Sequence, residues 1–530
     1  MPREAAVSET AGRAAGWQAE AAEIRRRREL ASGMGGPEKV RKQRDSGRLP
    51  ARERIARLAD PGSFDEIGAL TGFADYDEAG RLVSLTPANF IAGTARLGGR
   101  PVLLAVDDFT IRGGSGDAAI HAKQVFSERY ANEMRLPVVR LLDGASGGGS
   151  VKSTLDSGST YVPVNPGWDA VVDNLSLVPV VAAALGPTVG LGAGRLVMSH
   201  LAVMVTGVGQ LFTAGPPVMR GGTGEDLSKE ELGGHLVHRR NGAIERFAGS
   251  EEEAFEIIRG FLSYLPDNVH QIPPSPACAD PAARRDESLL GAVPRDPRQP
   301  YRIWPIMEAI FDRGSVFRYA EYGGATVTAL ARLGGYPVGV LATDPYKGAT
   351  MSLEGALAMT RLVDLCETFH LPLVSLTDCG GIAIGLVAEQ RGTIRHAARA
   401  IAAVYQARVP QAELIIRRVY GVAGAGIVNR HRAGRCWAWP SGDWGSLPVQ
   451  GGVEAAFRAR LDGAADPAAE AEQIRARLAA VSSPFRTAER FGVQDMIDPR
   501  ESRPLLCGWA RDAYRVLPEL TGRPAFGTRP

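Results

Sequence analysis

Apolar positions along the chain fall into short, nearly continuous runs that alternate with stretches of helical period. The runs "PVLLAV" (101–106) and "LPLVSL" (371–376) are typical of strands buried on both faces of a sheet. In "HAKQVFSERYANEMR" (121–135) the apolar residues instead recur every three to four positions, which predicts a helix. Strands and helices that alternate in this way predict an α/β fold with a largely parallel sheet.

This pattern of elements occurs twice. The segment "TARLGGRPVLLAVDDF" (94–109) matches "TALARLGGYPVGVLATDPY" (328–346) at an offset of 236 residues. After a helical stretch in each copy, "LPVVRLLDGASGG" (136–148) matches "LPLVSLTDCGG" (371–381) at an offset of 235. A register sustained over several elements indicates an internal duplication rather than a chance repeat of one hairpin.

The duplication predicts two domains, in agreement with a length of 530 residues, which is too long for one compact core. We expect them at 37–275 and 301–530. A proline- and charge-rich linker (276–300) would join them, and a helical extension (1–36) would precede them.

Composition excludes several functional classes. The chain has 61 basic and 59 acidic side chains, a balance that gives no reason to expect nucleic acid or a membrane surface as a partner. Its 5 cysteines form no CxxC pair, which speaks against a metal site or a disulfide framework and favours a cytoplasmic protein. The N-terminus has no apolar signal region, and no apolar run is long enough to cross a bilayer.

Glycine-rich turns follow the predicted strands at matching places in both copies. The first pair comes after Asp143 and Asp378, and the second lies in "ALGPTVGLGAGR" (184–195) and "RRVYGVAGAGI" (417–427). Such turns present backbone N–H groups to a negative oxygen. Phosphate binding is a weak alternative, since no GxxxxGK[ST] motif occurs and "VGLGAG" lacks its acidic partner. The other use is an oxyanion hole, and two such holes would suit a reaction in which two carbonyl oxygens become anionic.

Side chains offer no comparable candidate. The chain contains no GxSxG or HExxH motif and no catalytic Cys–His signature. His121 and His396 fall in predicted helices, where a lone histidine is more often structural or exposed. Cys379 adjoins the glycines but is interpreted as a small buried thiol.

An ordered series of segments resembles the carboxyltransferase (β) subunits of biotin-dependent acyl-CoA carboxylases of the propionyl-, methylcrotonyl- and acetyl-CoA type. The segments are 47–68, 109–125, 221–266, 377–411, 437–457 and 496–506. The resemblance implies two tandem crotonase-like (ClpP/crotonase) domains, the first for acyl-CoA and the second for carboxybiotin. It further implies a homo-hexamer whose active site lies between the N domain of one subunit and the C domain of another.

In that family, carboxybiotin loses CO2 within the site and the biotin enolate takes a proton from the α-carbon of the acyl group. The substrate enolate then attacks CO2. The resemblance therefore supplies the two developing oxyanions, and it makes biotin the base, which explains why no side-chain base is found.

On the acyl-CoA side, the family turn falls within "DGASGGGS" (143–150). We place its Ser-Gly-Gly on 146–148 with a two-residue insertion, although a gapless register puts Ala145-Ser146 there. The resemblance then implies oxyanion donors at Gly147 and Gly148, and acyl-CoA contacts at Ser146, Gly149, Gly190 and Gly192.

On the biotin side, the resemblance implies catalytic positions at Gly381 and Val449. Biotin contacts are expected at Gly380, Gly421, Val422 and Gln450. The family's Gly-Ala donor pair aligns with Pro448-Val449, and proline has no N–H to donate. The sequence thus predicts the loss of one donor, or a rearranged site.

The expected protein partners follow from two motifs that this sequence does not contain. It has no ATP-grasp glycine loop and no Met-Lys pair for biotinylation. Biotin carboxylase and the biotin carrier are therefore expected as separate chains or as one fused α subunit. Biotin would arrive on the carrier, and coenzyme A as part of the substrate. Alternatives are a transcarboxylase or biotin-dependent decarboxylase subunit, a catalytically reduced scaffold, and a biotin-independent hydrolase or hydratase using Glu389. The sequence does not identify the acyl group of the substrate, although the altered turns favour a nonstandard acyl group.

Overall fold

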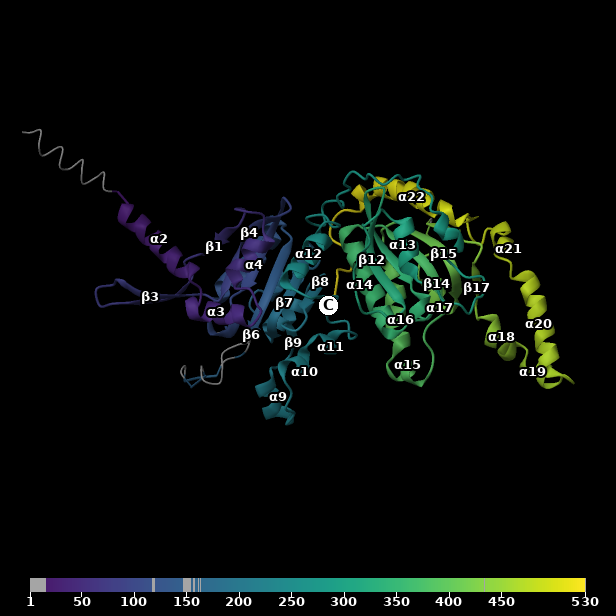
Figure 1. Ribbon diagram of the computed structural model, residues 1–530, viewed down its shortest axis with the longest axis horizontal. Helices are drawn as coiled ribbons and strands as arrows, with labels where there is room; N and C mark the ends of the chain where they lie inside the picture. The colour runs from purple at the N-terminus through teal and green to yellow at the C-terminus, as the bar shows by residue number, and fades with distance from the viewer. Residues whose placement is uncertain are drawn as a thin grey trace, which may run out of the picture.

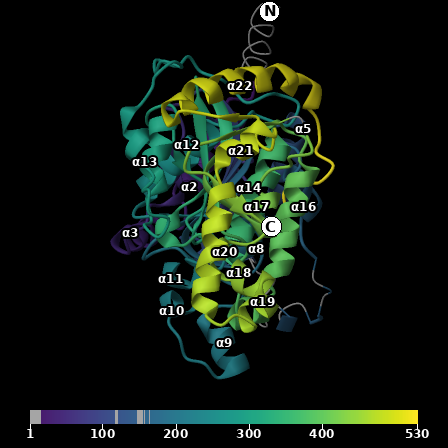
Figure 2. The same ribbon diagram turned by 90° about the vertical axis from the view of Figure 1, so that its right-hand side faces the viewer.

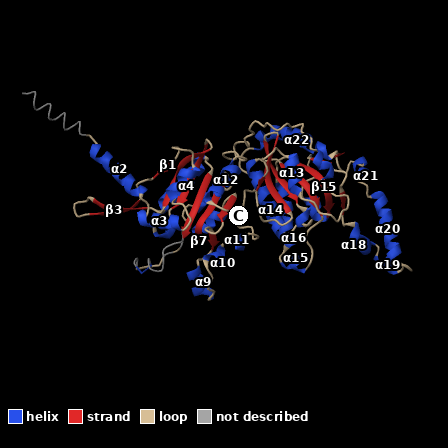
Figure 3. Ribbon diagram, viewed as in Figure 1, coloured by secondary structure: helices blue, strands red, loops and turns tan. Residues whose placement is uncertain are grey.

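A computed structural model describes residues 16–116, 120–145, 154–155, 158–160, 162, 164–432 and 434–529. Two similar α/β units lie side by side along the longest axis of the molecule (Figure 1). The chain runs from the first unit into the second, and its last residues return to the first, where Arg523 pairs with Asp173. In each unit helices cover a central sheet (Figure 3).

The first unit contains an eight-stranded sheet in the order β1-β4-β5-β6-β7-β8-β10, with β9 paired to β7. Its strands are β1 (Asp65–Ile67), β4 (Phe90–Leu97), β5 (Arg100–Asp107), β6 (Val138–Ala145), β7 (Val180–Val189), β8 (Leu201–Val205), β9 (Gln210–Phe212) and β10 (Arg246–Ala248), and β2 (Gly72–Tyr76) and β3 (Leu82–Pro87) form a separate hairpin. Its helices are α2 (Gln18–Ser32), α3 (Pro37–Asp45), α4 (Ala51–Leu58), η1 (Arg112–Gly114), α5 (His121–Met134), α7 (Trp168–Asn174), α8 (Leu191–Val197), α9 (Pro216–Thr223), α10 (Lys229–Gly233), α11 (His235–His238) and α12 (Glu251–Leu262).

The second unit repeats this sheet in the order β11-β12-β13-β14-β15-β16-β18, with β17 paired to β15. Its strands are β11 (Phe317–Arg318), β12 (Thr326–Leu333), β13 (Tyr336–Thr343), β14 (Leu373–Cys379), β15 (Gln411–Tyr420), β16 (Arg435–Ala438), β17 (Asp443–Gly445) and β18 (Asp495–Met496). Its helices are η3 (Glu287–Gly291), α13 (Ile303–Ile310), η4 (Pro345–Lys347), α14 (Leu353–Phe369), α15 (Leu386–Gln390), α16 (Thr393–Gln406), α17 (Gly421–Gly426), α18 (Val449–Ala456), α19 (Arg458–Asp462), α20 (Pro467–Val481), α21 (Pro484–Glu489), η5 (Pro499–Glu501), α22 (Ser502–Val516) and η6 (Leu517–Leu520).

Identical strand order in the two sheets confirms the duplication inferred from sequence. The equivalence extends to detail, because the pairing register shifts between Leu142 and Gly144 in the first sheet and between Thr377 and Cys379 in the second. In both sheets an antiparallel pair is followed by parallel strands whose apolar runs are buried on both faces, as at Leu103, Val181 and Val374.

Two parts of the chain project from the paired units. The β2–β3 hairpin and α2 extend from the first unit, while α18–α21 form a helical arm along the far side of the second (Figures 1 and 2). The boundaries 1–36, 37–275, 276–300 and 301–530 remain a prediction. None of the helices in the described ranges is both long and apolar enough to cross a membrane.

Candidate active site

The carboxylate of Asp378, at the end of β14, is buried and held by two arginines of the neighbouring strand β15. It accepts hydrogen bonds from Arg417 Nε at 3.1 Å and from Arg418 Nε at 2.6 Å. The backbone N–H of Arg418 donates to the same carboxylate at 3.1 Å. Because a buried charge is tolerated only when it is paired and hydrogen-bonded, these contacts make Asp378 an anchor for the turn that follows it.

Asp143 has the same place in the first unit, with arginines from a different part of the chain. Arg48 Nη1 lies 2.7 Å and Arg54 Nη1 2.8 Å from its carboxylate, and Gln43 Nε2 donates to it at 3.2 Å. These side chains come from the segment that includes α3 and α4. The Asp143 N–H donates to Asp107, and burial raises the pKa of Asp107 to about 6.

Directly after Asp378, the chain makes the first predicted turn. The N–H of Gly380 donates to the Ala349 carbonyl at 2.6 Å, so this amide is not free for a ligand. Gly381 has φ +119°, and its N–H has no hydrogen-bond partner among the described residues. A β-bridge from Met351 to Ile382 fixes the turn from the other side. Gly381 is therefore the better-placed donor of the two.

The second turn is the same in both units. Gly190 follows β7 with φ +62°, and Gly421 follows β15 with φ +60°, a left-handed conformation that favours glycine. An added Cβ on Gly421 would lie 3.6 Å from the Ser446 carbonyl, and one on Gly381 would lie 4.0 Å from that of Tyr420. The structure thus brings the predicted biotin-side glycines and the segment leading to Pro448 together.

Pro448 is the residue that caps the start of α18, with φ −56° and ψ 143°. The first intrahelical bond that involves it runs from Gly452 N–H to the Pro448 carbonyl at 3.1 Å. The amides of Val449, Gln450 and Gly451 belong to the first turn of this helix, where N–H groups have no intrahelical acceptor. Proline removes the donor at 448, yet amides from 449 onward still point out of the helix end.

The remaining predicted positions divide into three groups. Val422 is 64% exposed, whereas Gly192 is buried inside α8. Of Val449 and Gln450 only the backbone is described. Ser146, Gly147, Gly148 and Gly149 lie outside the described residues. Just before them, the α-carbon of Gly144 approaches Gly114 too closely for any side chain at either position. The proposed roles of all these residues stay predictions.

The structure gives little support to a catalytic side chain as an alternative to the main-chain donors. Glu389 is exposed on α15 and His121 is exposed at the start of α5. Cys379 is 3% exposed, and burial raises the pKa of its thiol. A protonated buried thiol is a poor nucleophile, in agreement with its interpretation as a packing residue.

Sequence reasoning missed the arginines that hold the two aspartates. Adjacent arginines within the apolar strand "ELIIRRVYG" (413–421) were a signal, because charged residues in a buried run need partners. Arg48 and Arg54 gave no such signal, since they lie far from Asp143 in sequence.

Comparison with known proteins shows to which family this chain belongs. Residues 42–510 match the family model of the carboxyl transferase domain. The chain belongs to the carboxyl transferase family. This carboxyl transferase is 30% identical, over 91% of its length and 93% of the relative, to the propionyl-CoA carboxylase carboxyltransferase subunit of Haloferax mediterranei. It is 29% identical, over 93% and 95%, to the methylmalonyl-CoA decarboxylase subunit alpha of Propionigenium modestum.

Its fold is that of a solved transcarboxylase 12S hexamer with methylmalonyl-coenzyme A and methylmalonic acid bound. The two align with a TM-score of 0.83 at 28% identity, over 96% of each chain. The resemblance seen in the sequence is confirmed, and so is the fold of two tandem crotonase-like domains.

Proposed function

We propose that this carboxyl transferase moves a carboxyl group from carboxybiotin on a carrier protein to the α-carbon, or the vinylogous carbon, of an acyl-CoA. The observation that carries the proposal is the repeated pair of turns. Each unit has an anchored aspartate near the end of one strand and a left-handed glycine after the next. The sequence places glycines shortly after each of these aspartates. Two matched sets of main-chain donors suit a reaction in which a thioester oxygen and a ureido oxygen both become anionic.

On the carboxybiotin side, the amides of Gly381 and Val449 are the proposed donors. Biotin, when bound, supplies the ureido ring that carries the carboxyl group and accepts the substrate proton. The chain's own contribution is to hold the ring and to stabilise negative charge on its oxygen without rearranging. On the acyl-CoA side we assign the same task to Gly147 and Gly148, with Ser146, Gly149, Gly190 and Gly192 lining the thioester.

Biotin carboxylase and the biotin carrier are the proposed partners, on separate chains or on one fused subunit. The transcarboxylase relative is described as a hexamer, and we propose a homo-hexameric core here as well. In such a core, the acyl-CoA turns of one copy would face the biotin turns of another.

The test is carboxyl transfer by the purified protein. Carboxylated carrier is mixed with a panel of acyl-CoAs, and each carboxyacyl-CoA is measured by mass spectrometry. We expect one or a few acyl-CoAs to be carboxylated in proportion to the carrier consumed. Absence of transfer to every acyl-CoA, by intact assemblies, would favour the scaffold alternative.

A decarboxylase or transcarboxylase role is the second candidate, because a methylmalonyl-CoA decarboxylase subunit is among the relatives. The discriminating measurement runs the reaction backwards, from carboxyacyl-CoA to biotinylated carrier. A reverse rate well above the forward rate would support that role.

A further inference from the structure

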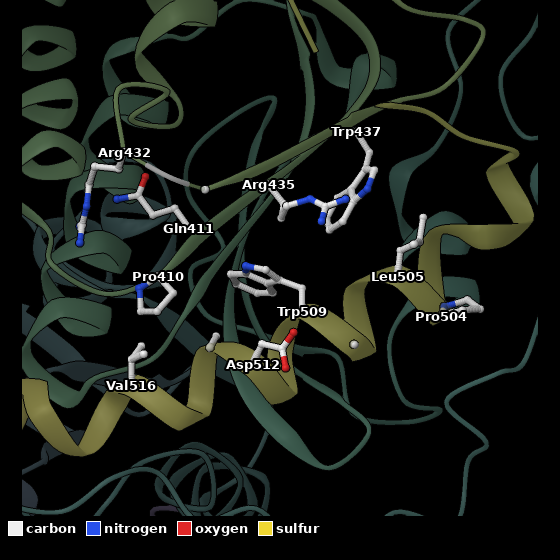
Figure 4. A pocket seen from close by; sticks show the side chains of 13 residues that line it. Pro410, Gln411, Arg432, Arg435, Trp437, Pro504, Leu505, Trp509, Asp512 and Val516 are labelled. Atoms are coloured by element: carbon white, nitrogen blue, oxygen red, sulfur yellow. The ribbon is translucent and has the colours of Figure 1, made fainter. Parts of the chain in front are cut away.

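A cavity of about 600 Å³ lies between α22 and the starts of β15 and β16, and side chains of α22 face those of β16 across it (Figure 4). Its two arginines already have partners. Arg432 donates to the carbonyls of Ala407 and Arg408. The Arg435 guanidinium lies 4.8 Å from the centre of the Trp437 ring. A smaller cavity, between the two units, differs because some of its donors have no acceptor in the described part of the chain.

This smaller cavity has a volume of about 330 Å³ and takes its walls from both units. Segment 241–245 of the first unit, between α11 and β10, lies on one side. Helices α14 and α16 of the second unit contribute the other side, and the C-terminal segment contributes Arg529. The polar lining that matters here is Glu245, Tyr322, Arg361, Arg399 and Arg529.

A buried ion pair fixes one wall of the cavity. Glu245 is 2% exposed, and one of its carboxylate oxygens accepts a hydrogen bond from the Ala202 N–H at 2.7 Å. Arg361 Nη2 lies 3.1 Å from the other oxygen. The Nη groups of Arg361 also donate to the carbonyls of Ser199 at 2.8 Å and Arg529 at 3.1 Å. The position and charge of this wall are therefore set before any ligand binds.

Two donors of the same wall lack an acceptor. Tyr322 is 4% exposed, and its hydroxyl makes no hydrogen bond of normal geometry with any described residue, although Glu245 and Arg361 lie near it. The buried Nε of Arg361 has no partner either. Burial raises the pKa of Tyr322, so its oxygen keeps the proton at neutral pH. Because buried donors are nearly always paired, an acceptor oxygen from a ligand would complete this wall.

Two exposed arginines supply further positive charge. Arg399 on α16 and Arg529 form no ion pair with any residue that the structure describes. Asp364 is a further carboxyl group near them. Burial raises its pKa to about 6, although Arg529 and Arg399 act in the opposite direction. Three arginines thus face Glu245 and one carboxyl that ionises weakly, which leaves the cavity with an excess of positive charge.

The C-terminal segment that brings Arg529 to this cavity is tied to both units (Figure 1). Arg523 pairs with Asp173 of the first unit. Thr528 is buried, and its hydroxyl oxygen lies 3.3 Å from that of Thr368 in α14. A ligand that contacts Arg529 would therefore contact all three parts of the chain that meet here.

The lining also has an apolar part, which includes the half-buried Val197 at the end of α8 and Leu357 of α14. An inorganic anion would leave these side chains uncovered, whereas a short carbon chain would pack against them. Carboxylates suit the donors at both kinds of position, the buried pair and the exposed arginines, because bonds from arginine to a carboxylate are among the strongest in proteins.

We propose that this cavity, which we call the joint site, binds a small organic dicarboxylate. One carboxylate accepts from the Tyr322 hydroxyl and from Nε of Arg361, and the second pairs with Arg399 and Arg529. The joint site contains none of the residues assigned above to acyl-CoA or biotin, so it is a separate site.

The test measures binding of succinate to the purified full chain by calorimetry. Butyrate is the matched ligand, since it has the same four carbons but one carboxylate, and inorganic phosphate represents an anion without a carbon chain. No acyl-CoA or carrier is present, so the result does not depend on carboxyl transfer. The salt concentration is kept low because salt screens the exposed arginines.

Two variants address the two ends of the ligand. Tyr322→Phe removes a hydroxyl that makes no hydrogen bond of normal geometry, so the fold should keep its melting temperature. Arg399→Gln removes one exposed charge. Arg477→Gln is the matched control, since Arg477 is also exposed on a helix, α20, and lies outside the joint site.

We expect wild type and Arg477→Gln to bind one succinate per chain, more tightly than butyrate or phosphate. Each test variant should raise the Kd for succinate roughly tenfold or more, as expected for the loss of a bond to a charged group. It should also lose most of the rise in melting temperature that succinate gives wild type. Absence of saturable binding, butyrate or phosphate bound as tightly as succinate, or wild-type affinity in Tyr322→Phe and Arg399→Gln would each overturn the proposal.

Discussion

Replacing Val449 with proline removes one main-chain donor from the candidate biotin site and changes little else. Val449 is the first residue of α18, where proline is tolerated because that N–H has no intrahelical acceptor. The preceding Pro448, at φ −56° and ψ 143°, already has the conformation that a following proline favours. The helix should therefore form unchanged.

The magnitude follows from what such a donor contributes elsewhere. Loss of one oxyanion-hole N–H typically lowers kcat on the order of 10²–10³, or about 2.7–4 kcal/mol of transition-state stabilisation. Because the charge on the ureido oxygen develops mainly in the transition state, kcat should fall while the KM for the carrier stays nearly constant.

The assay is transfer from carboxylated carrier to the best acyl-CoA, with Val449→Ala as the control that keeps the N–H. Pro448→Ala adds a donor at the adjacent position and should raise kcat if the ureido oxygen lies between the two. Wild-type kcat in Val449→Pro, with Val449→Ala equally active, would refute the assignment of this amide.

Three further predictions concern the scaffold around the site. Asp378→Asn leaves the buried Arg417 and the half-buried Arg418 without their counter-ion and should lower the free energy of unfolding by ~3–5 kcal/mol, measured by denaturant titration. Asp296→Asn, in the exposed pair with Arg298, should have little effect. Burial lowers the pKa of His200 from 6.5 to about 3, so only the unfolded chain takes up this proton as the pH falls below 6.5. Stability should then drop by up to ~1.4 kcal/mol per pH unit towards pH 3, and an equal slope in His200→Gln would contradict this account. Gly339→Ala makes the added Cβ overlap the Cys366 sulfur and should lower the free energy of unfolding by ~1–3 kcal/mol. Gly508→Ala, whose Cβ meets open space, should melt no lower than wild type.

The duplication and its strand-end turns could be predicted because they depend on local patterns. Apolar runs identify buried strands, and glycine at a strand end identifies a sharp turn. Gly190 and Gly421 were found in this way, and the structure gives both a left-handed conformation. The family resemblance added chemistry that no pattern of this kind contains.

Other features depend on contacts between residues far apart in the sequence, and the local sequence pattern gives no signal for them. Arg54 gave no sign of pairing with Asp143, 89 positions away. Gly380 was predicted to contact biotin, yet the Ala349 carbonyl accepts a hydrogen bond from its amide. The effect of Pro448 also needed the structure, because only the start of α18 shows which amides remain available.

The two anchoring aspartates have a consequence for how the enzyme can change. Arg417 and Arg418 are neighbours in the strand beside Asp378, while Arg48 and Arg54 reach Asp143 from the segment that includes α3 and α4. The two halves thus hold equivalent turns with arginines from different parts of the chain. On the proposed assignment of acyl-CoA to the first half and biotin to the second, selection for a new acyl chain can change the first half and leave the second unchanged.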